Sequence, residues 1–184
     1  MKTFRLVSLV ILLAVMGAGC PKKSDPLPPV IPPDNPKKIY DPDYGVSIVV
    51  PQDWKVSFRD GNPFLFAVAP GAGPYGPMVN VVTEQISQRL NPFDYLQANI
   101  PTMRLSLPDM KIVRSGIDLR SGVNVAWLQY TYPRGKQRIE AISFAQTIDY
   151  QAYVITAVAP ADQFKKNEAL FRAIGYSLKV DARR

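Results

Sequence analysis

The sequence predicts an α+β fold in which an antiparallel β-sheet is flanked by helices. Strand-like segments fall into two groups, one on each side of a helical segment, and a second helical segment follows the later group. Turns of three or four residues join the later strands and are too short for a parallel crossover. Both helical segments have one apolar face that a sheet must cover. We therefore expect one strongly bent central sheet with the helices packed against it.

Four strands are expected before the first helix. The first is rich in β-branched residues and stops at Pro51. The pair Asp60–Gly61 is typical of a turn, and the Gly/Pro-rich segment 70–77 is typical of a loop. The four segments are 45–50, 54–58, 64–69 and 78–85.

The first helix is expected to begin at Asn91, a favourable N-cap, because Pro92 suits the first helical position. Apolar residues then recur at spacings of three and four, as they do on one helical face. Pro101 interrupts the pattern and predicts a kink or an early end. The apolar residues interpreted as core are Phe93, Leu96, Ile100, Met103 and Leu107.

Four further strands are expected to form an antiparallel meander, and a helix over 163–174 follows them. Asp162 is the candidate N-cap of this helix, and Gly175 is placed to end it. A strand over 176–180 would close the domain. The meander segments are 111–119, 123–132, 138–148 and 152–159.

The first twenty residues predict export and lipidation. Lys2 and Arg5 form a positive region, and the apolar run Leu6–Met16 is too short to span a bilayer. Small residues precede Cys20, the only cysteine, and this pattern resembles the bacterial lipobox. We interpret residues 1–19 as a lipoprotein signal peptide and Cys20 as the residue that carries acyl chains such as palmitate. An ordinary secretory signal with a chance cysteine is the alternative.

Residues 20–36 are interpreted as the lipidated cysteine and a proline-rich tether, and residues 37–184 as the domain. The tether has seven prolines over 21–36, which favours an extended chain of about 3.1 Å per residue. A docking motif for a polyproline reader is the alternative. Pro21 rather than Asp follows Cys20, which by analogy with enterobacterial sorting predicts the outer membrane, facing the periplasm, in a cell with two membranes.

The composition excludes several kinds of enzyme. The chain has no histidine, which excludes histidine-dependent triads and histidine zinc sites, and it contains neither SxxK nor GxSxG. Asp41, Asp43 and Asp53 lack the spacing of a calcium loop and are interpreted as turn residues. Glu84 and Glu140 lie in predicted strands and carry no catalytic signal by themselves. We expect a protein that is not an enzyme and binds no cofactor or metal. An enzyme that uses lysine or carboxylate side chains is the alternative.

Gly71, Gly73 and Gly76 spell GxGxxG, but this pattern binds phosphate only where it opens a helix. Pro77 and a strand-like run follow it here, so we interpret it as a hairpin loop. Tyr75 at the tip of this loop is a candidate partner contact.

Basic residues gather near the meander turns and on the last helix. A solvated surface is the first interpretation, and a positive face toward an acidic partner or lipid is the alternative. Arg134 and Lys136 are the candidate partner contacts, and nucleic acid is implausible for an exported protein. The other basic residues of the group are Arg114, Arg120, Arg138, Lys165, Lys166 and Arg172.

The segment Tyr44–Trp54, YGVSIVVPQDW, resembles the opening of PsbP-like domains, where a turn and a strand precede Pro and Trp. The segment 152–180 resembles their closing strand, helix and strand. The relatives include DcrB-type bacterial envelope lipoproteins and lipid-anchored cyanobacterial homologues. The resemblance implies an α/β/α sandwich over nearly the whole domain.

The resemblance also implies a role. Members act as accessory or assembly proteins of membrane complexes, so we expect a non-enzymatic envelope lipoprotein, a monomer held to the membrane through Cys20. A carrier of a small apolar ligand is the alternative. A photosystem-associated PsbP-like protein is a second alternative.

Overall fold

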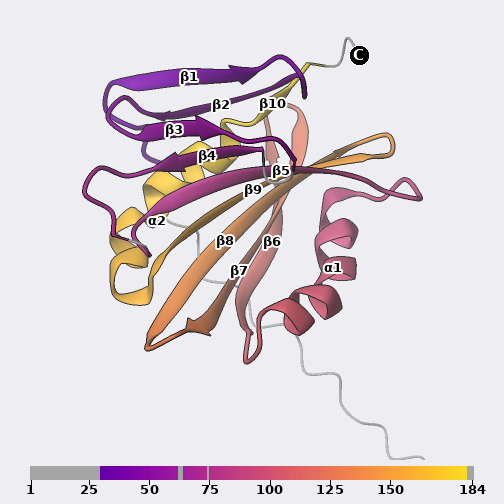
Figure 1. Cartoon of the computed structure of the whole chain (residues 1–184). Helices are drawn as coiled ribbons and strands as arrows, with labels where there is room; N and C mark the ends of the chain where they lie inside the picture. The colour runs from indigo at the N-terminus through magenta and orange to yellow at the C-terminus, as the bar shows by residue number, and fades with distance from the viewer. Residues whose placement is uncertain (1–29, 62–63, 74, 182–184) are drawn as a thin grey trace, which may run out of the picture.

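The computed structural model describes residues 30–61, 64–73 and 75–181, and these form two helices and ten strands (Figure 1). Their arrangement confirms the α+β class. The elements are β1 (Pro36–Asp41), β2 (Val46–Pro51), β3 (Lys55–Phe58), β4 (Leu65–Val68), β5 (Met78–Gln85), α1 (Pro92–Ser106), β6 (Lys111–Arg120), β7 (Val123–Arg134), β8 (Gln137–Ile148), β9 (Gln151–Pro160), α2 (Ala161–Tyr176) and β10 (Lys179–Val180).

The strands form two antiparallel sheets rather than the single bent sheet expected. A seven-stranded sheet has the order β3-β4-β5-β9-β8-β7-β6, and its last four strands are the predicted meander. A three-stranded sheet has the order β1-β2-β10. The division falls at Pro51, which ends β2, and at a turn closed by the Trp54 amide, which donates to the Pro51 carbonyl at 3.2 Å. The chain thereby leaves the small sheet before β3 begins.

The strand β1 was not predicted. Its sequence, PKKIYD, contains few residues that favour strands, and Pro36 is its first residue. The strand forms because β2 supplies a partner, with Ile39 opposite Ile48 and Pro36 opposite Pro51. The strand β1 therefore begins at Pro36.

The two helices cover opposite faces of the seven-stranded sheet (Figure 1). Alternate residues of β8 show this, because side chains alternate across a strand. Ala141 and Ala145 belong to the core cluster that includes the buried residues of α1. Ile142 and Phe144 belong to the cluster that includes those of α2. This second cluster also holds the apolar residues of β2, so the small sheet shares the core of α2.

Helix α1 begins as predicted, because the Asn91 side chain accepts hydrogen bonds from the amides of Phe93 and Asp94 at 3.0 and 2.9 Å. The early end predicted at Pro101 is wrong, since the helix continues to Ser106. Pro101 has no N–H to donate to the carbonyl of Gln97, one turn earlier. Because Pro101 is exposed, water can donate to that carbonyl instead.

Helix α2 is longer than the expected 163–174. Pro160 is its N-cap and provides no side-chain hydrogen bond, so the cap expected from Asp162 does not form. Gly175 lies inside the last turn instead of ending the helix, and Ser177 follows as the C-cap. A Cβ at Gly175 would collide with the ring of Phe144. The glycine is therefore needed for close packing of α2 on β8.

We predict that Gly175→Ala destabilises the domain by about 2 kcal/mol in urea unfolding. Overpacking a core costs about 1–3 kcal/mol, and the methyl group must displace the Phe144 ring. Gly73→Ala is the matched control, because a Cβ there meets open space. Equal stability of both variants would contradict the packing described for α2.

We also predict a loss of stability at alkaline pH. Burial raises the pKa of Tyr130 to about 12, from the ordinary value near 10, because the core disfavours the phenolate. The contribution of Tyr130 to the free energy of unfolding is fully present below pH 10. Above pH 10 the tyrosine ionises first in the unfolded chain, so this contribution falls until about pH 12. The contribution of Tyr130 to this loss is about 3 kcal/mol.

Unfolding measured from pH 8 to 12 tests this expectation. Tyr130→Phe should flatten the decline, whereas Tyr150→Phe, at a half-exposed ring, should leave it unchanged. A Tyr130→Phe profile parallel to the native one would contradict the assignment.

Candidate interaction surface

Tyr75 and Arg134, predicted separately as partner contacts, lie against each other. The Arg134 guanidinium carbon lies 5.0 Å from the centroid of the Tyr75 ring, a cation–π contact. Tyr75 comes from the loop between β4 and β5, and Arg134 ends β7. Both side chains are exposed, and Lys136 is exposed in the following turn.

The loop that carries Tyr75 is folded on itself. The Ala69 amide donates to the Pro77 carbonyl at 3.0 Å and closes the loop, and the Gly76 amide donates to Gly73 at 2.9 Å. A Cβ at Gly76 would collide with Ala72, so this position requires glycine. The loop joins two paired antiparallel strands and opens no helix, which confirms the hairpin interpretation of GxGxxG.

Two adjoining grooves lie beside this loop. The first, of about 390 Å³, is bounded by the loop together with Gln137, Pro160 and Gln163. The second, of about 340 Å³, is bounded by Gln137, Arg138 and the start of α2. We call the surface formed by loop 69–77, turn 134–137 and residues 160–163 the hairpin end. That it contacts a partner stays a prediction.

The remaining basic residues do not form one positive face. Arg114, Arg172 and Glu168 form a charge network between β6 and α2. The Glu168 carboxylate accepts hydrogen bonds from Arg114 and, at 3.1 Å, from Arg172. Arg114 also donates to Gln129 at 2.7 Å, and Gln129 donates to Glu140 at 2.6 Å. We call these residues the α2 charge network.

Arg172 corrects the interpretation of the last helix as a solvated basic face, because its side chain is 0% exposed. Its guanidinium carbon lies 4.9 Å from the Trp127 ring centroid. Gly116 makes room for this ring, since a Cβ there would lie 2.7 Å from Trp127 Cζ2. In the described part of the chain, two buried side-chain nitrogen atoms have no hydrogen-bond partner. They are Trp127 Nε1 and Arg172 Nη2.

The network continues to the end of α2 through Tyr176. The Arg172 side chain donates to the Tyr176 hydroxyl at 3.4 Å, and that hydroxyl donates to Asp118. Burial, aided by Asp118, raises the pKa of Tyr176. Arg120 lies over the Tyr176 ring at 4.5 Å. The sequence signal for this network was the Glu168–Arg172 spacing of four residues, which is also common on solvated helix faces.

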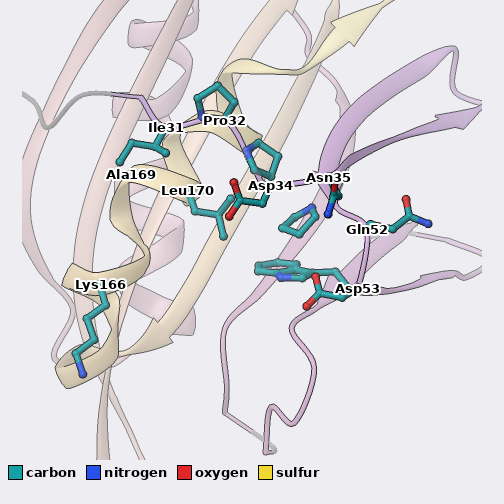
Figure 2. A pocket seen from close by; sticks show the side chains of 12 residues that line it. Ile31, Pro32, Asp34, Asn35, Gln52, Asp53, Lys166, Ala169 and Leu170 are labelled. Atoms are coloured by element: carbon teal, nitrogen blue, oxygen red, sulfur yellow. The ribbon is translucent and has the colours of Figure 1, made fainter.

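A third groove, of about 600 Å³, lies where the N-terminal segment meets the domain (Figure 2). The segment crosses from α2, where Ile31 lies near Ala169, to the turn after β2. There the Gln52 amide donates to the Asn35 carbonyl at 3.0 Å. The described end of the predicted tether therefore lies against the domain.

The carboxylates considered from the sequence lie apart. Asp41 ends β1 and accepts hydrogen bonds from the amides of Asp43 and Tyr44 at 2.9 and 3.1 Å, so it closes the turn that leads into β2. Glu84 accepts from Tyr95 of α1 at 2.7 Å, whereas Glu140 joins the α2 charge network. These two glutamates therefore lie on opposite faces of the sheet and cannot act on one bond.

Cys20 and the signal peptide 1–19 lie outside the described residues. In the part of the chain that the structure describes, no helix has the length and hydropathy to cross a membrane. Nor do three His, Cys, Asp or Glu residues of that part gather as metal ligands.

No family model matches the sequence, and no curated protein matches it. Solved structures do match the fold. Cyanobacterial PsbP (CyanoP) from Synechocystis has a TM-score of 0.65 at 12% identity, over 79% of this chain and 92% of that protein. LpqN of Mycobacterium tuberculosis has a TM-score of 0.60 at 15% identity, over 79% and 90%.

The Ran-binding protein Mog1p of Saccharomyces cerevisiae is also similar, with a TM-score of 0.58 at 10% identity over 79% of this chain and 95% of that protein. These likenesses show the fold alone. The PsbP-like fold implied by Tyr44–Trp54 and by 152–180 is confirmed. The likeness to DcrB-type lipoproteins stays a prediction.

We predict that Glu168→Ala destabilises the domain by about 3–5 kcal/mol, because it leaves the buried Arg172 without a carboxylate. Arg89→Ala is the matched control, because Asp149 has a positive φ of 51° that alanine would strain. The ion pair of Arg89 with Asp149 has both side chains 69% exposed, so its loss should cost less than about 1 kcal/mol.

A double variant, Glu168→Leu with Arg172→Met, separates charge from packing. It should recover most of the stability in urea unfolding, since apolar residues often replace a buried ion pair without loss. A Glu168→Ala protein as stable as the Arg89→Ala control would contradict the role given to the network.

Proposed function

We propose that the protein is a non-enzymatic envelope lipoprotein that binds a membrane protein complex as an accessory or assembly factor, through the hairpin end. The observation that carries the proposal is the contact between Tyr75 and Arg134 on one exposed surface. Tyrosine and arginine are, with tryptophan, the residue types enriched among the side chains that contribute most to binding at protein interfaces. Tyr75 borders the first groove, so a partner side chain has a place to insert beside the pair.

The internal hydrogen bonds of loop 69–77 support a binding role, because an ordered loop loses less conformational entropy on association. The basic residues Arg134, Lys136 and Arg138 would favour an acidic patch on the partner. The hairpin end also lies close to the N-terminal segment. Gln163 borders the groove of about 390 Å³, and Lys166, three residues later on α2, borders the groove of about 600 Å³ beside that segment.

The N-terminal segment would hold this surface near a bilayer. Residues 31–35 border a groove on the domain, so residues 21–29 remain as the spacer from Cys20. In an extended polyproline form this spacer would reach about 28 Å, against roughly 50 Å for the whole predicted tether. Acyl chains on Cys20 would provide the membrane attachment.

LpqN, which is described as involved in cell envelope biogenesis, supports an envelope setting by likeness of fold. The alternative of an apolar-ligand carrier has weaker support. The groove of about 600 Å³ is lined by apolar side chains such as Trp54 and Leu170 and also by the charged Asp34, Asp53 and Lys166, so its lining does not single out an apolar ligand.

We predict that crosslinking in cells, followed by purification from solubilised membranes, recovers a defined set of partners with the native chain. Tyr75→Ala with Arg134→Ala should lower this recovery about tenfold, the loss expected for a central interface pair. Cys20→Ala should also lower it, because the protein would no longer be concentrated at the membrane.

The matched control is Tyr150→Ala with Arg89→Ala, a second exposed stack in which Arg89 lies 5.4 Å from the Tyr150 ring centroid. This control should recover partners as the native chain does. Equal recovery by the native chain, the variant at Tyr75 and Arg134, and the control would place the interface elsewhere. Absence of any specific partner would refute the proposed function.

A further inference from the structure

The strand β6 is an edge of the seven-stranded sheet, and its apolar side chains are exposed. It pairs with β7 on one side, and no strand of the described residues covers the other side. Ile117 is 47% exposed and Leu119 is 70% exposed. The exposed large apolar residues on β6 and at the start of β7 are Ile112, Val113, Ile117, Leu119 and Val123.

Such an edge is normally protected, because its free amide and carbonyl groups attract another strand. Protection here is confined to the ends of the strand, where Lys111 and Arg120 stand and where a bulge falls between Ile112 and Arg114. The segment from Arg114 to Leu119 carries charges at Arg114 and Asp118, but hydrogen bonds to Glu168 and Tyr176 hold both side chains toward α2. It contains no lysine, proline or bulge that would block the edge itself. An apolar group of this kind on a free edge indicates an interface.

We infer that the occupant is a second copy of this chain, paired antiparallel through β6 about a two-fold axis at Gly116. Antiparallel strands place opposite residues on the same face, so the register can be tested against the charges. An axis at Gly116 places Arg114 opposite the partner's Asp118, and the symmetry repeats this attraction. The alternative axis at Ile117 places Arg114 opposite the partner's Arg120, and an axis at Asp118 opposes two aspartates.

The side chains are available for this pairing. The side chain of Arg114 is 22% exposed and that of Asp118 is 26% exposed, although both belong to hydrogen bonds within the chain. A guanidinium has five donor hydrogens and a carboxylate accepts several bonds, so each has capacity for a partner. Charge complementarity therefore favours the Gly116 register over its neighbours.

The apolar residues are buried by the same register. On the face of the sheet that bears α1, Ile117 lies opposite the partner's Ser115. Leu119 comes at the end of the pairing, near the partner's bulge between Ile112 and Arg114. On the other face, Gly116 adds no side chain at the axis, because the Trp127 ring occupies that space. The pairing joins two seven-stranded sheets and closes at two copies. It replaces the monomer expected from the sequence and does not depend on the hairpin end.

The register is tested by disulfide formation in cells that express two differently tagged full-length chains. Cys20 is the only native cysteine and is expected to be acylated, so an introduced cysteine is the only free thiol. Ser115→Cys in one chain and Ile117→Cys in the other should crosslink, since opposite Cα atoms lie about 4.5–5.5 Å apart, within disulfide range.

Two copies of Ile117→Cys should crosslink far less, because the shift of two residues separates them by more than about 7 Å. Leu105→Cys, on the exposed side of α1, is the background control, since Leu105 is 84% exposed. Crossed-pair crosslinking no higher than this background, or equal crosslinking by identical residues, would overturn the register.

Sedimentation of the detergent-solubilised full chain tests the dimer itself. The native chain should form a dimer, and Ile117→Lys should raise the dissociation constant about tenfold or more by placing charge on the apolar contact. Leu105→Lys should sediment as the native protein does. A native chain that stays monomeric at all concentrations would refute the proposal, and so would an Ile117→Lys dimer as tight as the native one. A monomeric native chain would refute a second copy as the occupant even where β6 binds an extended segment of another protein.

Discussion

The buried guanidinium of Arg172 is the constraint on which the arrangement of α2 depends. A charge removed from water must be compensated, and Glu168 one turn earlier on the same helix provides the carboxylate. Trp127 lies against the guanidinium, and Gly116 leaves space for the indole. These contacts favour the observed rotation of α2 about its axis, because a rotated helix would lose the contact of Arg172 with Trp127 and that of Glu168 with Arg114. Gly175 then allows the last turn to approach the sheet.

The same network explains why the two faces of β6 differ. Toward α2, Arg114 and Asp118 are held by Glu168 and Tyr176, so this face of the edge strand is polar and ordered. Toward α1, Ile117 is left exposed and is not part of the core cluster that includes the buried residues of α1. The polar face of β6 already has its hydrogen-bond partners, whereas burial of the exposed apolar side chains on the other face would be favourable.

Local pattern was sufficient for the elements whose alternation is uninterrupted. The segment 78–85 was predicted with the bounds of β5, and the meander differed from the prediction by two residues or fewer at each end. Long-range pairing was not predictable: β1 forms only because β2 offers an edge. The burial of Arg172 was missed because a basic residue four positions from an acidic one is equally typical of solvent. Tyr75 and Arg134 were each predicted as contacts, but only the fold shows that they touch.

The likeness in fold to proteins of 10–15% identity limits where function can be encoded. CyanoP, LpqN and a Ran-binding protein are differently described, so the shared sandwich does not specify a task. What distinguishes this chain must lie in segments that the core does not require. The α2 charge network is part of the folding requirement, and its loss would disturb every surface at once. The hairpin end and the edge of β6 are exposed instead, so substitutions there can change binding while the fold remains. At these two surfaces, substitutions can therefore change binding without changing the stability of the fold.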